Sequence, residues 1–318
     1  MTEKRSFSFK KLLVGSFGTF LSLVALAIVF TFLSSSFLTF TNFRNILIQS
    51  GTNAVIAAGM TFVIISGNID ISVGSILALS SCLSATVMKD TGNVTLGILT
   101  ALCAGLLLGV INGLLIAYLG FPPFIVTMSN MWLYRGSAYL FTGGMAVTGL
   151  PTRLSNLILG DVGPVPNIVI LIVIVYAVCH FVLTRTTVGR RIFAVGDNRE
   201  SARLSGINTR STVLLVYAVC GFLASLSGLI YMGRLNSGQP IAGQSYEMYA
   251  IAAAVIGGAS LTAGGIGNMV GTLIGAIFIS VLNNGLTIMN VNTYWQQVCM
   301  GIVLLIAIGL DKLRKSIK

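Results

Sequence analysis

Apolar runs long enough to cross a membrane recur along the whole chain, and this feature most limits its fold. A helix crosses the hydrocarbon core of a bilayer with about 20 residues, and short polar connections separate the runs. Only 8% of the residues are charged, against roughly 25% in a soluble domain. The sequence therefore predicts an all-α polytopic membrane protein that forms a single transmembrane domain over residues 1–318.

We interpret the runs as about ten transmembrane helices. The predicted spans cover residues 12–33, 46–65, 71–88, 95–119, 124–141, 167–183, 212–233, 248–261, 267–289 and 293–310. The eighth span is shorter than the others, so a re-entrant segment is the alternative there.

The basic residues orient these spans. Of the 19 lysines and arginines, four precede the first span, six lie in the loop 184–211 and four follow the last span. Basic loops stay in the cytoplasm, so both termini and this loop are predicted to be cytoplasmic. Six arginines beside only Asp197 and Glu200 exceed what orientation needs, which predicts a docking surface for a soluble partner. Because the charge follows the membrane topology, a nucleic-acid partner is disfavoured.

Two breaks interrupt the apolar pattern. The segment 66–74 places Asn68, Asp70 and Ser72 between two apolar runs. Either Asp70 or Ser72 can cap the helix that follows, or the break borders a transport path and offers polar groups to a hydrophilic cargo. The second break, 257–267, has five glycines in eleven residues, which suits close backbone approach or a re-entrant turn.

Three asparagines, Asn112, Asn283 and Asn284, lie inside apolar runs. An amide in a membrane must find a hydrogen-bonding partner. Each therefore either bonds a neighbouring helix or lines the path.

Glycines at four-residue spacing clear one helix face for close packing. They are Gly105, Gly109 and Gly113, and again Gly267, Gly271 and Gly275. Such a glycine-rich bundle favours an alternating-access carrier over a permanently open channel.

The longest predicted external segment, 142–166, contains a short apolar stretch at 154–159 between glycines and prolines. It predicts a small surface helix. The segment is either a connector or a docking surface for an external partner.

Motifs for chemistry are missing from the sequence. The five cysteines stand singly in apolar runs and the one histidine has no ligand companion, so no metal site is predicted. The chain lacks any Gly-Lys pair and hence the usual phosphate-binding loop. Asp70 and Glu247 are the only acids near the path. We therefore predict no catalytic residues and no cofactor, and an energy source outside this chain.

The loop residues 189–198, followed by 201–208, resemble the cytoplasmic coupling loop of the ribose-type family of ABC sugar-importer permeases. Further stretches similar to the family are residues 53–61, 66–75, 239–247, 250–260, 270–276 and 282–286. Together they extend the resemblance through nearly the whole chain.

This resemblance implies a multi-pass permease of the bacterial inner membrane that forms a homodimer. It further implies a cytoplasmic ABC ATPase, which would bind the coupling loop, and an extracytoplasmic sugar-binding protein. Ser201 and Asp197 depart from the family pattern of paired alanines and a second glycine. The residues at the motif positions of the coupling loop are Gly196, Asn198, Ala202, Ser205 and Gly206.

Members of the family carry ribose, galactose, xylose, arabinose, allose or autoinducer-2, and the resemblance is closest to the ribose carriers. The alternatives are another of these sugars, a nucleoside or branched-chain amino acid in the same architecture, or a secondary sugar carrier that works alone. Small, scattered polar groups predict a weak, transient route, not a pocket of clustered amide and aromatic groups. The candidate path residues are Asn68, Asp70, Ser72, Asn112, Asn283 and Asn284.

Overall fold

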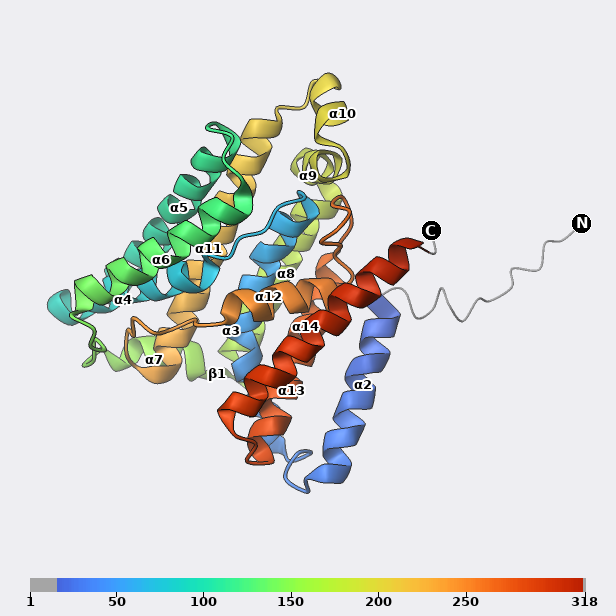
Figure 1. The fold of residues 1–318 in the computed structure, drawn as a ribbon. Coiled ribbons are helices and arrows are strands. Elements are labelled where there is room, and N and C mark those ends of the chain that lie inside the picture. The colour runs from blue at the N-terminus through green and yellow to red at the C-terminus, as the bar shows by residue number, and fades with distance from the viewer. Residues whose placement is uncertain (1–15, 317–318) are drawn as a thin grey trace, which may run out of the picture.

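The computed structural model describes residues 16–316, and it is a bundle of helices with one small hairpin (Figure 1). The basic segment before residue 16, the start of the first predicted span and Lys318 lie outside the described residues. The elements are α2 (Ser16–Leu33), α3 (Phe40–Ile65), α4 (Val73–Thr91), α5 (Val94–Ala117), α6 (Pro123–Thr142), α7 (Thr152–Leu159), β1 (Asp161–Val162), β2 (Val165–Pro166), α8 (Asn167–Arg185), α9 (Thr187–Asp197), α10 (Arg199–Leu204), α11 (Thr209–Leu235), α12 (Tyr246–Ile256), α13 (Met269–Ile288) and α14 (Thr293–Ser316).

A helix occupies each of the ten predicted spans, which confirms the all-α class. Five helices of the described part, α3, α5, α8, α11 and α13, are long and apolar enough to cross a membrane. The number of crossings and the side on which the termini lie stay predictions.

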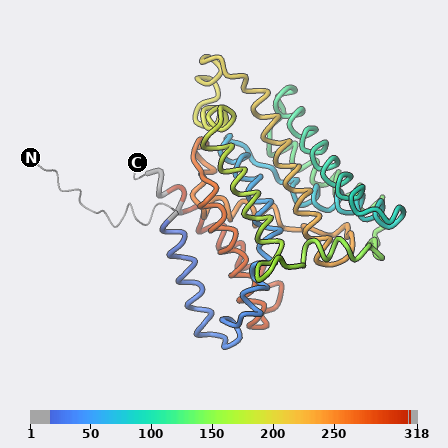
Figure 2. Tube along the Cα trace, turned by 180° about the vertical axis from the view of Figure 1, so that it is seen from behind, coloured from blue at the N-terminus to red at the C-terminus, as the bar shows by residue number. Residues whose placement is uncertain are grey.

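Helix α3 is the centre of the bundle. In its most apolar window 94% of the residues are buried, and α8, α11, α12 and α13 surround it (Figures 1 and 2). In α5 and α8 the corresponding buried shares are only 28% and 33%. These two helices therefore present apolar faces to the outside of the bundle, as lipid-facing helices do.

The glycines at four-residue spacing in α5 and α13 allow close contact with neighbouring helices, as predicted. A Cβ atom at Gly105 would meet the carbonyl oxygen of Gly221 at 2.5 Å, so α5 and α11 touch through their backbones. On the other side of the bundle, Gly271 and Gly275 of α13 lie against the backbone of α12 and its end. Any larger side chain at these positions would force the helices apart.

Both predicted helix breaks are present as irregular backbone. The second break shortens the helix in the predicted eighth span. Helix α12 has 11 residues, which at 1.5 Å per residue covers about 16 Å, roughly half of a bilayer core of about 30 Å. Within the predicted eighth span, 248–261, the helix therefore ends at Ile256, as the re-entrant alternative allows. An irregular segment 236–245 precedes this short helix, and the glycine-rich loop 257–268 follows it.

Arg135 of α6 supports the irregular part of this crossing. Its Nη1 atom donates hydrogen bonds to the carbonyl oxygens of Pro240, at 2.6 Å, and Ala242, at 2.5 Å. Backbone acceptors that leave a helix inside a membrane need such partners. The single arginine within a predicted span therefore has a structural use.

The predicted surface helix in 142–166 is confirmed as α7. The β1–β2 hairpin follows it, with Val162 paired to Val165. An ion pair of 2.9 Å between Asp161 and Arg44 joins this segment to the first turns of α3.

Candidate functional site

The loop 184–211 folds into the short helices α9 and α10, which lie at one end of the bundle beyond the tips of most long helices (Figure 1). Side chains cap each turn: Thr186 Oγ1 accepts from the amide of Gly189, and Asn198 Oδ1 accepts from the amide of Ser201 at 2.9 Å. All six arginines of the loop are exposed. The sequence thus builds a rigid, basic projection outside the apolar bundle.

The predicted coupling residues divide by burial. Ser205 and Gly206 are exposed at the end of α10, and Gly206 has a φ of +82°, which favours glycine. Ala202 is only 4% exposed, so it packs the loop from within. Asn198 is the helix cap. Sequence reasoning did not single out Leu204, which is 75% exposed at the end of α10.

Gly196, unlike the exposed Ser205 and Gly206, packs against the end of α3 and the glycine-rich loop 257–268. A Cβ atom there would overlap the carbonyl oxygen of Ile65 and lie 2.6 Å from the amide nitrogen of Gly265. The same amide donates a hydrogen bond of 2.8 Å to Ile65. Helix α9, the end of α3 and the glycine-rich loop therefore meet at one point.

The glycine-rich loop is also held from the C-terminal side. Ser260 Oγ and Thr262 Oγ1 donate to Asp311 Oδ2 of α14 at 3.0 and 3.2 Å. Asp311 is buried. This loop therefore connects α14 to the contact between α9 and α3.

Three of the predicted path residues, Asp70, Ser72 and Asn112, come together in the interior. The backbone amide and the hydroxyl of Ser72 donate to Asp70 Oδ1 at 2.9 and 2.6 Å. Asn112 Nδ2 donates to Ser72 Oγ at 2.7 Å and reaches Asp70 Oδ2 at 3.5 Å. All three side chains are buried. Hydrogen bonds thereby join the first break to the C-terminal part of α5.

Helix α6 completes this network with two residues that sequence reasoning missed. Asn130 Nδ2 donates to Asn112 Oδ1 at 2.6 Å, and the Tyr134 hydroxyl lies 3.2 Å from the same oxygen. Asn130 is an amide within an apolar span, the signal that singled out Asn112. We call the set Asp70, Ser72, Asn112, Asn130 and Tyr134 the bonded network.

Two further predicted path residues form hydrogen bonds outside this network. Asn68 Nδ2 donates to the backbone and side-chain oxygens of Ser66 at 3.0 and 2.9 Å. Asn284 Nδ2 donates to Asn42 Oδ1 of α3 at 2.9 Å. Asn283, which is next to Asn284 in the chain, lines a cavity of the bundle. Neither Asn68 nor Asn284 lines this cavity.

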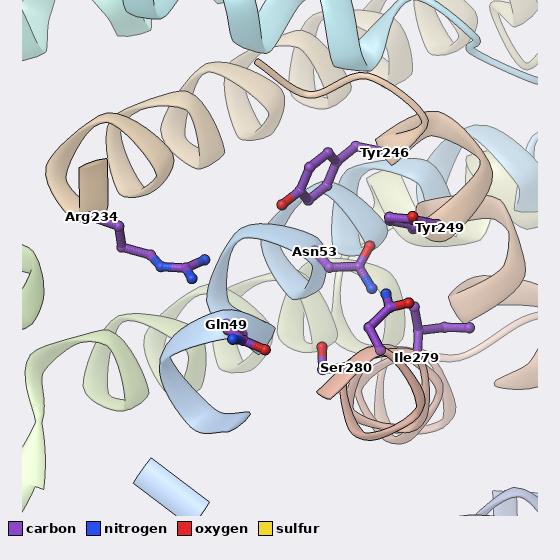
Figure 3. Close-up of a pocket in the computed structure, with 8 residues that line it drawn as sticks. Gln49, Asn53, Arg234, Tyr246, Tyr249, Ile279 and Ser280 are labelled. Atoms are coloured by element: carbon purple, nitrogen blue, oxygen red, sulfur yellow. The ribbon is translucent and has the colours of Figure 1, made fainter. Parts of the chain in front are cut away.

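That cavity lies between α3, α12, α13 and the end of α11 (Figure 3). Its volume is about 160 Å³. We call it the amide–tyrosine pocket. The lining residues are Gln49, Asn53, Arg234, Tyr246, Tyr249, Ile279, Ser280 and Asn283.

Two lining amides of this pocket have free polar atoms. Among the described residues neither Oδ1 nor Nδ2 of Asn53 has a hydrogen-bonding partner, and neither does Oδ1 of Asn283. The rings of Tyr246 and Tyr249 stand edge to face with centroids 5.6 Å apart. Segments distant in sequence thus bring amide and aromatic side chains together around one cavity.

An apolar helical bundle with a polar interior pocket and a basic projection at one end defines a membrane transport subunit. The family model described as "Branched-chain amino acid transport system / permease component" matches residues 42–308. The chain belongs to this family. It is a multi-pass protein of the inner membrane and a transporter component.

Several curated proteins are similar over nearly their whole lengths. The ribose import permease protein RbsC of Bacillus subtilis is 42% identical, over 94% of this chain and 93% of the relative. The D-allose transport system permease protein AlsC of Escherichia coli is 37% identical, over 98% and 96%. The xylose transport system permease protein XylH of Escherichia coli is 34% identical, over 92% and 91%. These relatives confirm the predicted resemblance to ribose-type sugar permeases. No solved structure matches the chain.

Proposed function

We propose that this chain is the permease subunit of an ATP-driven importer that moves a monosaccharide, ribose, into the cytoplasm by alternating access. The loop 184–211 carries this proposal, because six exposed arginines and the exposed Leu204 form a docking surface outside the bundle. A secondary carrier that works alone has no use for such a surface. ATP hydrolysis belongs to the soluble partner, since this chain has no Gly-Lys pair for a phosphate loop.

The cargo follows from the relatives and from the pocket. Relatives of this chain are named for ribose, D-allose and xylose, whereas the family description names branched-chain amino acids. Among residues 16–316, no aspartate or glutamate lines the amide–tyrosine pocket, so the ammonium group of an amino acid would have no counter-charge there. Amides and tyrosines suit the hydroxyl groups of a neutral sugar.

The assembly proposed here has two copies of this chain, an ABC ATPase against the coupling loops and an extracytoplasmic sugar-binding protein on the opposite side. Ser205, Gly206 and Leu204 contact the ATPase, and Gly196 transmits its movement to the end of α3. Among the path residues, Asn283 contacts cargo, while the bonded network holds the first break in shape.

Replacing Gly206 by tryptophan tests the docking role. A large side chain on the exposed tip of the loop should leave the permease in the membrane but abolish uptake of radiolabelled ribose and its coupling to ATP hydrolysis. Gly206→Asn is the matched control, since asparagine tolerates a positive φ better than most residues and is small. Normal uptake and a normal ATPase complex in Gly206→Trp would contradict the proposal.

A further inference from the structure

We infer that the amide–tyrosine pocket is a binding site for one neutral sugar within a single subunit, with Asn53 as its central hydrogen-bonding residue. This inference rests on the proposed import of a monosaccharide and gives that path a specific location.

The unpartnered amide of Asn53 is the observation that points to a ligand. The side chain is only 4% exposed, lines the pocket and lacks a partner for both polar atoms among the described residues. Buried polar groups in folded proteins are nearly always paired, so each exception requires an explanation. On the same helix Thr61 Oγ1 donates to Ala57 O at 2.7 Å and Ser50 Oγ to Leu47 O at 2.8 Å. Thr52 Oγ1, next to Asn53 in the chain, is also without a partner among the described residues, but Thr52 does not line the pocket.

The free atoms select the chemistry of the ligand. Asn53 needs both a donor and an acceptor, and Asn283 Oδ1 needs a donor. A hydroxyl group supplies both functions. A phosphate or carboxylate only accepts, so it would leave the two Oδ1 atoms unpaired. An ammonium group only donates, so it would leave Asn53 Nδ2 unpaired. A molecule rich in hydroxyl groups therefore fits best.

The other residues that line the pocket also suit a sugar. The side chain of Arg234 reaches toward the cavity from α11, and those of Asn53 and Gln49 reach toward it from α3 (Figure 3). Arg234 forms no ion pair with any carboxylate of the described residues, and it can donate to sugar oxygens. The tyrosine rings offer an apolar surface for the C–H groups of a sugar ring, together with polar hydroxyls.

The pocket also lies where an incoming sugar would first reach the bundle. Arg234 is in the last turn of α11, Tyr246 begins α12 and Asn283 is near the end of α13. The proposed topology directs these helix ends outward. The volume of about 160 Å³ lies below the roughly 300 Å³ at which ordinary ligand pockets begin, so the site holds its sugar weakly.

The test uses the complete importer, with its ATPase and sugar-binding protein, in proteoliposomes. Asn53→Leu and Asn283→Leu should each lower the initial rate of radiolabelled ribose uptake at least tenfold, while the assembly with the ATPase is unchanged. Asn45→Leu is the matched control, because Asn45 is an exposed amide of the same helix outside the pocket. Its uptake should equal that of the wild type.

Thermal unfolding separates a ligand-binding role from a structural one. Asn53→Leu should melt at the wild-type temperature or above it, since the variant loses only an unpartnered buried amide. A lower melting temperature together with lost uptake would show a structural role and overturn the inference. If Asn53→Leu does not reach the membrane, ribose uptake by Asn283→Leu is the test. Uptake by Asn283→Leu with wild-type kinetics would then overturn the inference.

Failure of the inference differs from failure of the proposed function. Wild-type ribose uptake with unchanged kinetics in Asn53→Leu would overturn only the pocket, whereas a wild-type importer that moves no sugar would overturn both.

A ligand-observed NMR titration of the purified permease tests which class of ligand the pocket binds. Ribose at millimolar concentration should give a binding signal with the wild-type permease, and this signal should be absent with Asn53→Leu. Binding of leucine or ribose 5-phosphate that depends on Asn53 would overturn the assignment to neutral sugars.

Discussion

Two groups of amides in the interior of this protein have opposite hydrogen-bonding states. In the bonded network, Asn112 donates to Ser72 and accepts from Asn130, with the Tyr134 hydroxyl in reach. In the amide–tyrosine pocket, Asn53 has no partner for either polar atom among the described residues. The difference teaches that burial of an amide does not by itself mark a transport path. The proposed sugar site differs from the bonded network in the free hydrogen-bonding capacity of Asn53.

The origin of the two groups explains their states. The bonded network joins α4, α5 and α6, which follow one another in the chain, so each polar group meets its partner within a compact unit. The pocket gathers residues of α3, α11, α12 and α13 around a cavity. The cavity keeps the amides of Asn53 and Asn283 apart from other protein groups and available to a ligand.

The largest expected effect is on the bonded network. Asn112→Leu should lower the free energy of unfolding by about 2–4 kcal/mol. Four side-chain hydrogen bonds are lost, of which the one to Asp70 is long at 3.5 Å, and one such bond between membrane helices contributes roughly 0.6–1.7 kcal/mol. Equilibrium unfolding of the purified permease in mixed micelles measures this. A stability equal to that of the wild type would remove the distinction between the two groups.

A smaller loss is expected for Tyr134→Phe. The ring is buried to 1% exposure and stays in place, so only the hydroxyl contact with Asn112 and Leu108 disappears. The cost should be about 1 kcal/mol in the same unfolding assay. Tyr294→Phe is the control, because Tyr294 is exposed. Equal effects of the two substitutions would argue against a cooperative network.

The pocket should respond in the opposite direction. Asn53→Leu should leave the free energy of unfolding unchanged or raise it by up to about 1 kcal/mol, because an unpaired buried polar group is replaced by an apolar one of similar size. Unfolding in micelles without sugar measures this difference. A clear loss of stability would place Asn53 with the bonded residues.

The smallest effect is the stabilisation of the wild type by its cargo. Ribose at a concentration equal to its dissociation constant should stabilise the permease by about 0.4 kcal/mol, and Asn53→Leu should show no such gain. Isothermal titration without the binding protein should give a dissociation constant weaker than micromolar, which corresponds to about −8 kcal/mol. Micromolar affinity would contradict the weak, transient route predicted from the sequence.

The sequence by itself determined the features that depend on local pattern. Apolar runs specified the helices, the breaks at 66–74 and 257–267 followed from polar and glycine residues, and glycine spacing specified the close contacts of α5 and α13. The basic loop was evident from its six arginines. Each of these depends on residues within a few turns of one another, where composition and periodicity decide the structure.

Only the tertiary structure decided which polar atoms meet. Asn283 and Asn284 are adjacent, yet one lines the pocket and the other bonds Asn42, because successive residues point about 100° apart on a helix. Ala202 proved buried within a loop whose neighbouring residues are exposed. The short α12 and the tyrosines that it brings to Asn53 depend on contacts across some 200 residues. Local sequence specifies a face of each helix, but the partner of that face is set by how all the helices pack.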